Sequence, residues 1–328
     1  MIRATPAACR IVFVGAVEEG RRCLEAMLRD GERLAGIVTL KEEWARETSG
    51  AVPFDELASA HGIPLVKVRD LNHPANVERV RALAPDLILV IGWTRLVGAE
   101  IRAIPRLGAI GFHASLLPRY RGRAPVNWAI IHGENVTGNT MFYLDGGVDT
   151  GDIIAQRSLT IGPRDTCATL YARVADAAHG MLRENLPLLK AGNAPRRPQD
   201  HNLATVMPKR TPEQGVIDWT LDAAALDRWV RALTHPYPGA FTSLGNERLF
   251  VWQAAEAAAV GPPAPGRILD IGGAGVIVGT GAGALVLERV QLAGEDEDAA
   301  AAIARRRGWT AGSLLGAPAA AGAPGVRP

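Results

Sequence analysis

The stretch "DLILVIGW", residues 86–93, is the clearest structural signal in the chain, because its hydrophobic side chains follow one another almost without interruption. A strand with one face in water alternates apolar and polar residues, so an unbroken run is typical of a strand that is buried on both faces. Further short β-rich runs alternate with helical patterns at residues 10–15, 34–40, 64–68 and 108–115. We therefore predict an α/β fold with a Rossmann-like, mostly parallel sheet covered by helices on both faces.

The pattern changes from about residue 205 onward. A helical stretch at 223–235 is followed by short strands that Gly-rich turns separate. This order predicts a small open β-barrel of the OB-like kind as a second domain. We place the domains at residues 1–203 and 204–316, and we expect the low-complexity end, residues 317–328, to be a disordered tail.

Composition excludes several classes of protein. The 328 residues carry a formal net charge of +2, which gives no global electrostatic reason for binding nucleic acid or a membrane. No apolar run approaches the roughly 18 residues of a membrane span. The three cysteines, Cys9, Cys23 and Cys167, are too few and too widely spaced for a disulfide framework or a metal site. We expect a cytoplasmic protein without a bound metal.

The candidate site lies in "IGFHASLLPRYRGRAP", residues 110–125. His113 stands near the carboxyl end of a predicted strand, where such sheets bind ligands. The later "YLDGGVDTGDI" adds Asp145, Asp149 and Asp152 around a Gly-rich turn. A carboxylate beside a histidine orients the ring and lets the pair handle protons near neutral pH. The plainer interpretations also stay open: a histidine satisfied in the core, and aspartates that only build the turn.

These residues resemble a known family. "HASLLPRYRGRAPVNWAIIHGE" together with "LDGGVDTGDIIAQ" is similar to the signature of the 10-formyltetrahydrofolate-dependent formyltransferases, and the likeness extends to about residue 295. Within the family, the chain most resembles the enzymes that formylate an amino sugar on a nucleotide carrier. The resemblance implies N-formyl transfer from 10-formyltetrahydrofolate, a folate co-substrate, to a primary amine.

The resemblance also assigns roles to residues. It implies that His113 and Asp149 are catalytic: the histidine stabilises a tetrahedral oxyanion, and the aspartate assists it in moving the amine proton. It places folate contacts on three segments and one arginine: Arg95, Leu96 and Val97; Ser115, Leu116, Leu117 and Pro118; Asp145, Gly146, Gly147 and Val148; and Arg123. Much of this recognition would come from backbone groups.

One position departs from the family. Where the resemblance leads us to expect an asparagine, two residues before His113, this chain has Gly111. A carboxamide donor aimed at an oxyanion is worth about 2.7–4 kcal/mol in comparable sites. Four explanations stay open: another donor such as Asn127, a backbone N–H or a water fills the place; the glycine makes room for a bulkier ligand; the enzyme is slow; or the protein binds folate without transferring the formyl group.

The charge of two parts of the chain bears on which amine accepts the formyl group. From Thr205 onward there are eleven Lys and Arg against twelve Asp and Glu, a formal charge of −1. The family's initiator-tRNA enzymes carry a basic insertion after the second strand, whereas "LKEEWARETSG" at residues 40–50 is more acidic than basic. Both observations favour a nucleotide-linked amino sugar over methionyl-tRNA. Hydroxyornithine or an antibiotic precursor is a further alternative, and the triple arginine "ARRRGW" is the one feature that favours an anionic partner. The oligomeric state stays open, with a homodimer among the options.

Overall fold

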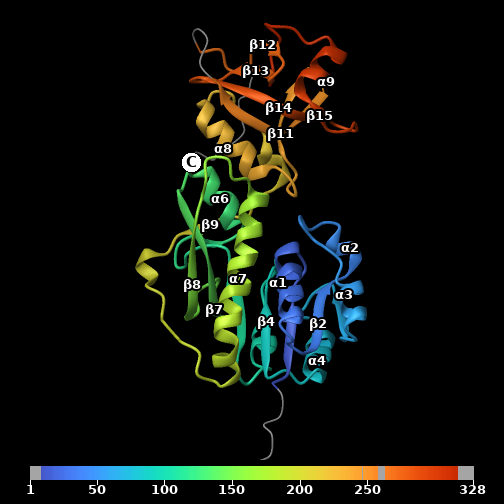
Figure 1. Cartoon of the computed structure of the whole chain (residues 1–328), viewed down its shortest axis with the longest axis vertical. Helices are drawn as coiled ribbons and strands as arrows, with labels where there is room; N and C mark the ends of the chain where they lie inside the picture. Colours follow the sequence, from blue (N-terminus) through green and yellow to red (C-terminus); the bar gives the residue numbers. More distant parts are fainter. Residues whose placement is uncertain (1–8, 246, 258–262, 317–328) are drawn as a thin grey trace, which may run out of the picture. The chain divides into compact units, whose positions relative to one another are not determined.

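The computed structural model describes residues 9–245, 247–257 and 263–316, which form two compact units (Figure 1). The first unit contains the described residues up to Pro125 together with Val136–Thr160 and Tyr171–Pro208. The second contains Val126–Asn135, Ile161–Leu170 and the described residues from Lys209 onward. These units are discontinuous in sequence, whereas the sequence analysis placed one boundary after residue 203. The predicted disordered tail lies outside the described residues.

The first unit is built on a seven-stranded sheet with the order β3-β2-β1-β4-β5-β7-β8. Its strands are β1 (Ile11–Val14), β2 (Leu34–Leu40), β3 (Leu65–Val68), β4 (Leu87–Val90), β5 (Ala109–His113), β7 (Val136–Tyr143) and β8 (Ile153–Thr160). The pairs from β3 through to β5 are parallel, and β7 and β8 continue the sheet in antiparallel pairs. The predicted Rossmann-like, mostly parallel sheet is therefore confirmed.

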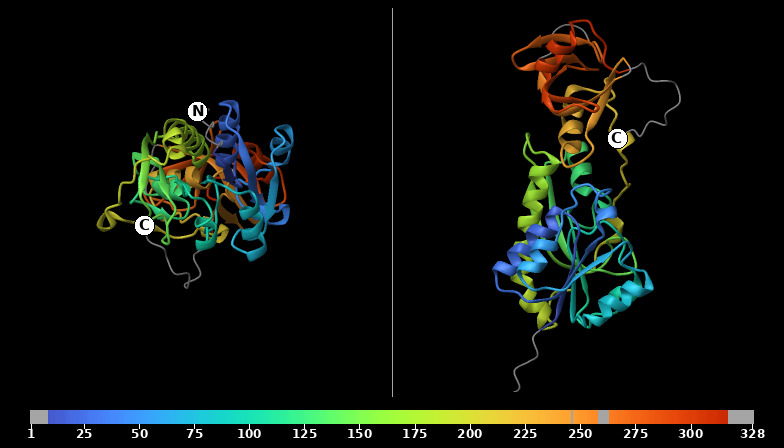
Figure 2. Two further views of the ribbon diagram at one scale, coloured as in Figure 1. Left: turned by 90° about the horizontal axis from the view of Figure 1, so that it is seen from below. Right: turned by 90° about the vertical axis from the view of Figure 1, so that its right-hand side faces the viewer.

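Helices cover both faces of this sheet (Figure 2, right). On one face, α1 (Glu18–Arg29), α3 (Asp55–Ala60) and α7 (Cys167–Lys190) pack in a cluster with Ile11, Phe13, Leu87 and Leu89. On the other, α4 (Pro74–Ala82) and α5 (Ala99–Arg102) pack with Val12, Val14, Ile88 and Val90. Leu87, Ile88 and Leu89 have no exposed surface, as the unbroken apolar run predicts. The short α2 (Glu42–Ala45), α3 and α5 were not foreseen from the sequence.

The second unit contains an antiparallel sheet with the order β10-β11-β14-β13-β12, and β15 pairs with β14. Its elements are α6 (Pro125–Ile131), η2 (Pro212–Gly215), α8 (Ala223–Leu233), β10 (Ala240–Leu244), β11 (Glu247–Ala257), β12 (Ile268–Gly272), β13 (Gly275–Gly279), β14 (Ala284–Leu292), β15 (Asp298–Ala299) and α9 (Ala300–Arg307). Within the described residues the two end strands, β10 and β12, do not pair with each other, so the sheet stays open. This agrees with the predicted open barrel. No helix in the described part of the chain is long and apolar enough to span a membrane.

Candidate active site

His113 is the last residue of β5 and is 8 % exposed. Successive residues of a strand point to opposite faces of the sheet. Ile110 packs in the cluster under α1 and α7, whereas Ala109 packs in the cluster under α4. Gly111 and His113 alternate with Ile110, so the imidazole of His113 lies on the face that α4 covers.

Asp149 reaches His113 from the loop between β7 and β8. Because β7 is antiparallel to β5, its last residue, Tyr143, pairs with Ile110 rather than with His113. The loop that follows returns toward the end of β5, and Oδ2 of Asp149 lies 3.5 Å from Nδ1 of His113. The same oxygen accepts a hydrogen bond of 2.8 Å from the backbone N–H of Gly122. The structure thus brings together the two residues that the sequence singled out as catalytic, a histidine and a carboxylate that can share a proton.

The backbone around this pair is held in an uncommon conformation. Tyr120, Ala124 and Asp149 have φ angles of 59°, 49° and 55°, in the left-handed region that non-glycine residues rarely enter. The carbonyl of Tyr120 accepts a hydrogen bond of 2.6 Å from Nε2 of His113. Strained residues of this kind persist only where their surroundings hold them, and they cluster at functional sites.

The "SLLP" loop after β5 is largely turned inward. Ser115 is 1 % exposed, and its hydroxyl donates to the Arg119 carbonyl over 2.7 Å. Leu117 is also buried and packs against Phe142 and Ile153. Leu116 and Pro118 are partly buried. The loop therefore presents backbone more than side chains, and a direct folate contact from the Ser115 hydroxyl stays a prediction.

The predicted folate contacts after β4 lie on a loop that is hydrogen-bonded to the segment following His113. The exposed Arg123 donates from its guanidinium to the carbonyl of Thr94. Leu96 is 66 % exposed. Arg95 donates to the carbonyl of Arg69, and the carbonyl of Val97 accepts from Arg102 over 3.1 Å.

The turn Asp145–Val148 is exposed at the start of the Asp149 loop. Oδ1 of Asp145 accepts from the backbone N–H of Gly147 over 3.0 Å and from the Thr150 hydroxyl over 2.6 Å. Asp145 therefore builds the turn, as the plainer interpretation of its role expects. A Cβ on Gly146 would meet no atom within 4 Å, and Val148 is 46 % exposed. Beside this turn lies a hollow of about 250 Å³, which Asp152, Arg196 and Gln199 also line.

Gly111 opens no free space in the site. A Cβ added to Gly111 would lie 2.5 Å from Cδ2 of Leu144 and 3.1 Å from the ring of Phe142. Side chains of the chain itself fill the place beside Gly111, which does not favour the explanation that this glycine makes room for a bulkier ligand. The proposed substitute donor, Asn127, belongs to the second unit, is 1 % exposed and donates to the carbonyl of Ala232 over 2.6 Å.

Sequence reasoning missed the segment around Gln199. The stretch from 192 to 215 reads as a polar, Pro-containing link. In the structure Gln199 is 6 % exposed and its amide bonds both to Arg121 and to the backbone at Asp149. Nothing in a polar segment signals which of its side chains is buried, because burial here depends on a contact with a distant loop. The arginine run at residues 119–123 is typical of a loop that meets an anionic ligand or solvent, whereas Arg121 is buried and bonds to Gln199.

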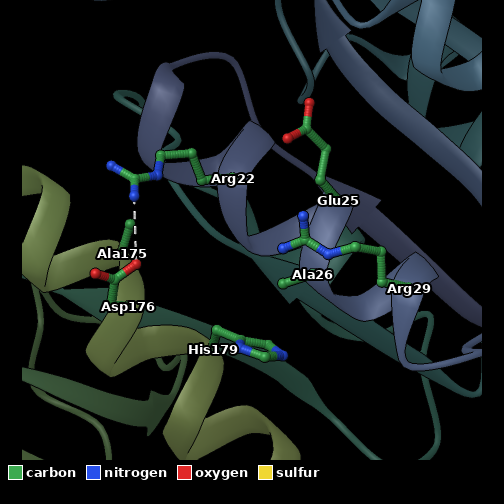
Figure 3. A pocket seen from close by; sticks show the side chains of 7 residues that line it. All are labelled: Arg22, Glu25, Ala26, Arg29, Ala175, Asp176 and His179. Atoms are coloured by element: carbon green, nitrogen blue, oxygen red, sulfur yellow. Dashed lines mark hydrogen bonds and ion pairs between the residues drawn. The ribbon is translucent and has the colours of Figure 1, made fainter.

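A second hollow lies between α1 and α7 (Figure 3). Nη2 of Arg22 lies 3.4 Å from Oδ1 of Asp176, and Nε2 of His179 lies 2.8 Å from Oδ2 of Asp30. Arg29 also lines the hollow. Because α1 and α7 cover the face of the sheet opposite to His113, this hollow is not part of the candidate site.

Comparisons with known proteins place the chain in a family. A family model described as formyl transferase matches residues 9–186, and one described as formyl transferase, C-terminal domain, matches residues 209–308. The methionyl-tRNA formyltransferase of Geobacter sulfurreducens is 37 % identical over 290 residues, which cover 88 % of this chain and 90 % of that protein. HypX from Aquifex aeolicus, solved with tetrahydrofolic acid, superposes with a TM-score of 0.66 at 20 % identity over 90 % of this chain and 46 % of its own. An N-formyltransferase from Helicobacter canadensis, solved with folinic acid and dTDP-3-aminofucose, gives 0.64 at 15 % identity over 85 % of this chain and 98 % of its own.

Proposed function

The chain belongs to the formyl transferase family, and on that premise we propose that it transfers a formyl group from 10-formyltetrahydrofolate to the α-amino group of methionyl-tRNA. As a member of this family it is an N-formyltransferase with 10-formyltetrahydrofolate as co-substrate. The observation that carries the choice of acceptor is the 37 % identity to a methionyl-tRNA formyltransferase along nearly the whole length of both chains.

In the proposed reaction the amine nitrogen attacks the formyl carbon and forms a tetrahedral intermediate. When the bond from this carbon to the 10-nitrogen of the folate breaks, the formyl group stays on the amine, and the amine's proton ends on the folate nitrogen. Nε2 of His113, which donates to the Tyr120 carbonyl over 2.6 Å in the structure, leaves that carbonyl and donates to the oxyanion. With Asp149 3.5 Å from Nδ1, the ring carries the proton from the amine nitrogen to the folate nitrogen. The buried position of His113 limits competing hydrogen bonds from water.

Two arginines that lie against the segment after β2 also support an anionic acceptor. Counted by itself, this segment is more acidic than basic, which is why the sequence favoured a sugar. In the folded unit, the guanidinium carbons of Arg69 and Arg95, from the loops after β3 and β4, lie 4.5 and 5.3 Å from the centre of the Trp44 ring. No described carboxylate pairs with either arginine, and Glu42 is engaged by Lys67. Unpaired guanidiniums beside an aromatic ring suit a phosphate backbone and its bases.

A nucleotide-linked amino sugar is the second candidate. The formal charge of −1 from Thr205 onward favours it, because this part of the chain offers little net attraction for tRNA. The triple arginine does not change this, since Arg306 pairs with Asp298 at 2.7 Å and Arg307 with Glu247 at 3.3 Å. A nucleotide sugar carries only two phosphates and needs fewer cations.

The test offers the purified chain 10-formyltetrahydrofolate and one acceptor at a time: methionyl-tRNA, dTDP-3-aminofucose, or hydroxyornithine. Release of tetrahydrofolate and formylation of the acceptor are both measured. We expect kcat/KM to be at least about 100-fold higher for methionyl-tRNA than for the other amines, a discrimination of about 3 kcal/mol. N-acetylmethionyl-tRNA, which lacks a free amine, and the His113→Ala variant are the matched controls.

A higher kcat/KM for dTDP-3-aminofucose would replace the proposed acceptor with the second candidate. Folate binding without turnover of any amine would contradict the proposal as a whole and indicate a folate-binding protein. If the His113→Ala variant released tetrahydrofolate as fast as the wild type, the proposed acceptor would be unaffected, but the proposed role of His113 would be contradicted.

A further inference from the structure

The segment 197–207, which we call the strap, runs along both loops of the site. At its start, Arg197 and Ile153 exchange two backbone hydrogen bonds of 2.8 and 3.0 Å, just after the Asp149 loop. At its end, β9 (Val206–Met207) pairs with β6 (Arg121–Gly122), and the carbonyl of Thr205 accepts from the N–H of Arg121 over 2.8 Å. The strap is thus hydrogen-bonded to the loop that carries Asp149 and to the loop that follows His113.

Gln199 lies between these two attachments and connects the loops through its side chain. Its Oε1 accepts from Nη2 of Arg121 over 2.6 Å and from Nε of the same residue over 3.2 Å. Its Nε2 donates to the carbonyls of Asp149 and Gly151, over 3.0 and 2.7 Å. With Gln199 and Arg121 each 6 % exposed, water has little access to replace these bonds.

Asp149 depends on such support more than an ordinary loop residue does. Its φ of 55° is unfavourable for a residue with a Cβ, so the loop keeps this conformation only while neighbouring groups hold it. Its Oδ2 is 3.5 Å from Nδ1 of His113, already at the outer limit of a hydrogen bond. A further displacement of the loop would separate the two groups.

We propose that Gln199 is a positioning residue for formyl transfer: its carboxamide ties the backbone of the Asp149 loop to Arg121 and so keeps the Asp149 carboxylate within reach of His113. Gln199 touches neither the imidazole nor the reacting groups. The proposal rests on the catalytic roles proposed above for His113 and Asp149.

Two variants separate the two halves of this connection. Gln199→Glu keeps an oxygen that accepts from Arg121. It replaces Nε2, which donates to the carbonyls of Asp149 and Gly151, with an oxygen that repels these carbonyls. Gln199→Met has a similar length and removes all four hydrogen bonds. We expect kcat with the preferred amine to fall about 10- to 100-fold in both variants, because a displacement near 1 Å has effects of that size. The KM values for folate and amine should stay within about threefold of the wild type.

A second readout does not need turnover. In protein labelled at histidine, the ring resonances of His113, assigned with a His113→Gln variant, report whether the Asp149 carboxylate is near. We expect Gln199→Glu to move them toward their positions in Asp149→Asn. The matched control is Asp200→Ala, which changes the next residue of the strap, an exposed side chain that bonds only to Asn202. It should leave both kcat and the resonances unchanged.

Unmoved His113 resonances with kcat within about twofold of the wild type in the folded Gln199→Glu variant would overturn the proposal. If Gln199→Met fails to fold, Gln199→Glu still decides it. If the wild type formylates no amine, the proposed function fails by itself, while the resonances continue to test the role of Gln199.

Discussion

The two parts of the candidate site differ in how the chain holds them. The proposed catalytic pair is held by the protein's own groups: His113 is 8 % exposed, its Nε2 donates to the carbonyl of Tyr120, and Asp149 accepts from the backbone N–H of Gly122. The predicted folate-binding loops present apolar side chains to solvent, with Leu96 66 % and Val148 46 % exposed. The hydrogen bonds of the His113–Asp149 pair are made within the protein, whereas the predicted folate-binding loops still expose apolar surface that a ligand could cover.

This difference follows from what each part has to do. Groups that stabilise a transition state act best when their geometry is set before the substrate arrives, because reorganisation during the reaction would cost free energy. Side chains that bind a flat, largely apolar pterin gain their free energy by leaving water when the ligand covers them. Substitutions in the first part should therefore change kcat, and those in the second should change KM.

The largest expected effect comes from His113→Ala. It removes both the donor to the oxyanion and the proton carrier, so we expect kcat to fall by about 1,000-fold or more. Binding of 10-formyltetrahydrofolate, measured by calorimetry, should change by no more than about threefold. His61→Ala, a histidine on an exposed turn, is the control and should behave as the wild type. A tenfold loss of folate affinity without a loss of kcat would place His113 in the binding part of the site.

The second effect concerns Gly111, which lies on the same strand and the same face as His113. An asparagine there would place its Cβ 2.5 Å from Cδ2 of the half-buried Leu144 and 3.1 Å from the ring of Phe142. Because the end of the leucine side chain can move aside more easily than the ring, we expect Gly111→Asn to lower the free energy of unfolding by about 1–2 kcal/mol, within the range for overpacking. Leu144→Ala made together with Gly111→Asn should recover at least half of this loss, because it removes the atoms that the new side chain meets. Urea unfolding of the two single variants and the double variant measures the coupling.

The kinetics of the same double variant test whether the missing carboxamide limits the rate. We expect its kcat to exceed that of Leu144→Ala by at least about tenfold, since a donor aimed at an oxyanion is worth several kcal/mol. Additive losses of stability would show that Leu144 does not fill the place. An unchanged kcat in the double variant would show that another group already serves as the donor.

The sequence was sufficient for those features that local pattern determines. The apolar run at 86–93 predicted a buried parallel strand, and Leu87, Ile88 and Leu89 are fully buried. His113 and Asp149 were found through motifs, and the loop between β7 and β8 does bring them together.

The sequence pattern could not predict the contacts that only the folded chain creates. These are Leu144 beside Gly111, Gln199 hydrogen-bonded to Arg121, and two arginines against the ring of Trp44. The charge argument about the acceptor failed to foresee the last of these, because it counted charges along the segment and not in space.

A third expectation concerns Glu19, a partly buried carboxyl in the first turn of α1. Burial of this carboxyl raises the pKa of Glu19 from 4.5 to about 7. Between these values the folded protein keeps a proton that the unfolded chain has lost, so stability falls as pH rises through this window. Glu19→Gln removes the free-energy cost of burying an ionisable carboxyl. We expect it to increase the free energy of unfolding by about 1–2 kcal/mol at pH 8.

The comparison at low pH makes this test specific. Below about pH 4 the side chain is neutral in the folded and the unfolded protein, so wild type and Glu19→Gln should unfold at the same urea concentration. The exposed neighbour Glu18 provides the control, and Glu18→Gln should be neutral at both pH values. An equal difference at pH 4 and pH 8 would mean that the glutamine acts through packing and not through charge.

The smallest expected effect is in the folate-binding loops. Leu96→Ser and Val148→Ser remove apolar surface that is exposed in the free protein, so each should change the free energy of unfolding by less than about 0.5 kcal/mol. Each should raise the KM for 10-formyltetrahydrofolate by about three- to tenfold, the equivalent of about 0.7–1.4 kcal/mol of lost burial, with kcat unchanged. The matched control is Val136→Ser, because Val136 is also an exposed valine but lies on β7, outside these loops. It should leave the KM for 10-formyltetrahydrofolate unchanged. A fall in kcat at unchanged KM in either loop variant would remove the division between the two parts of the site, because it would mean that these loops also position the reacting groups.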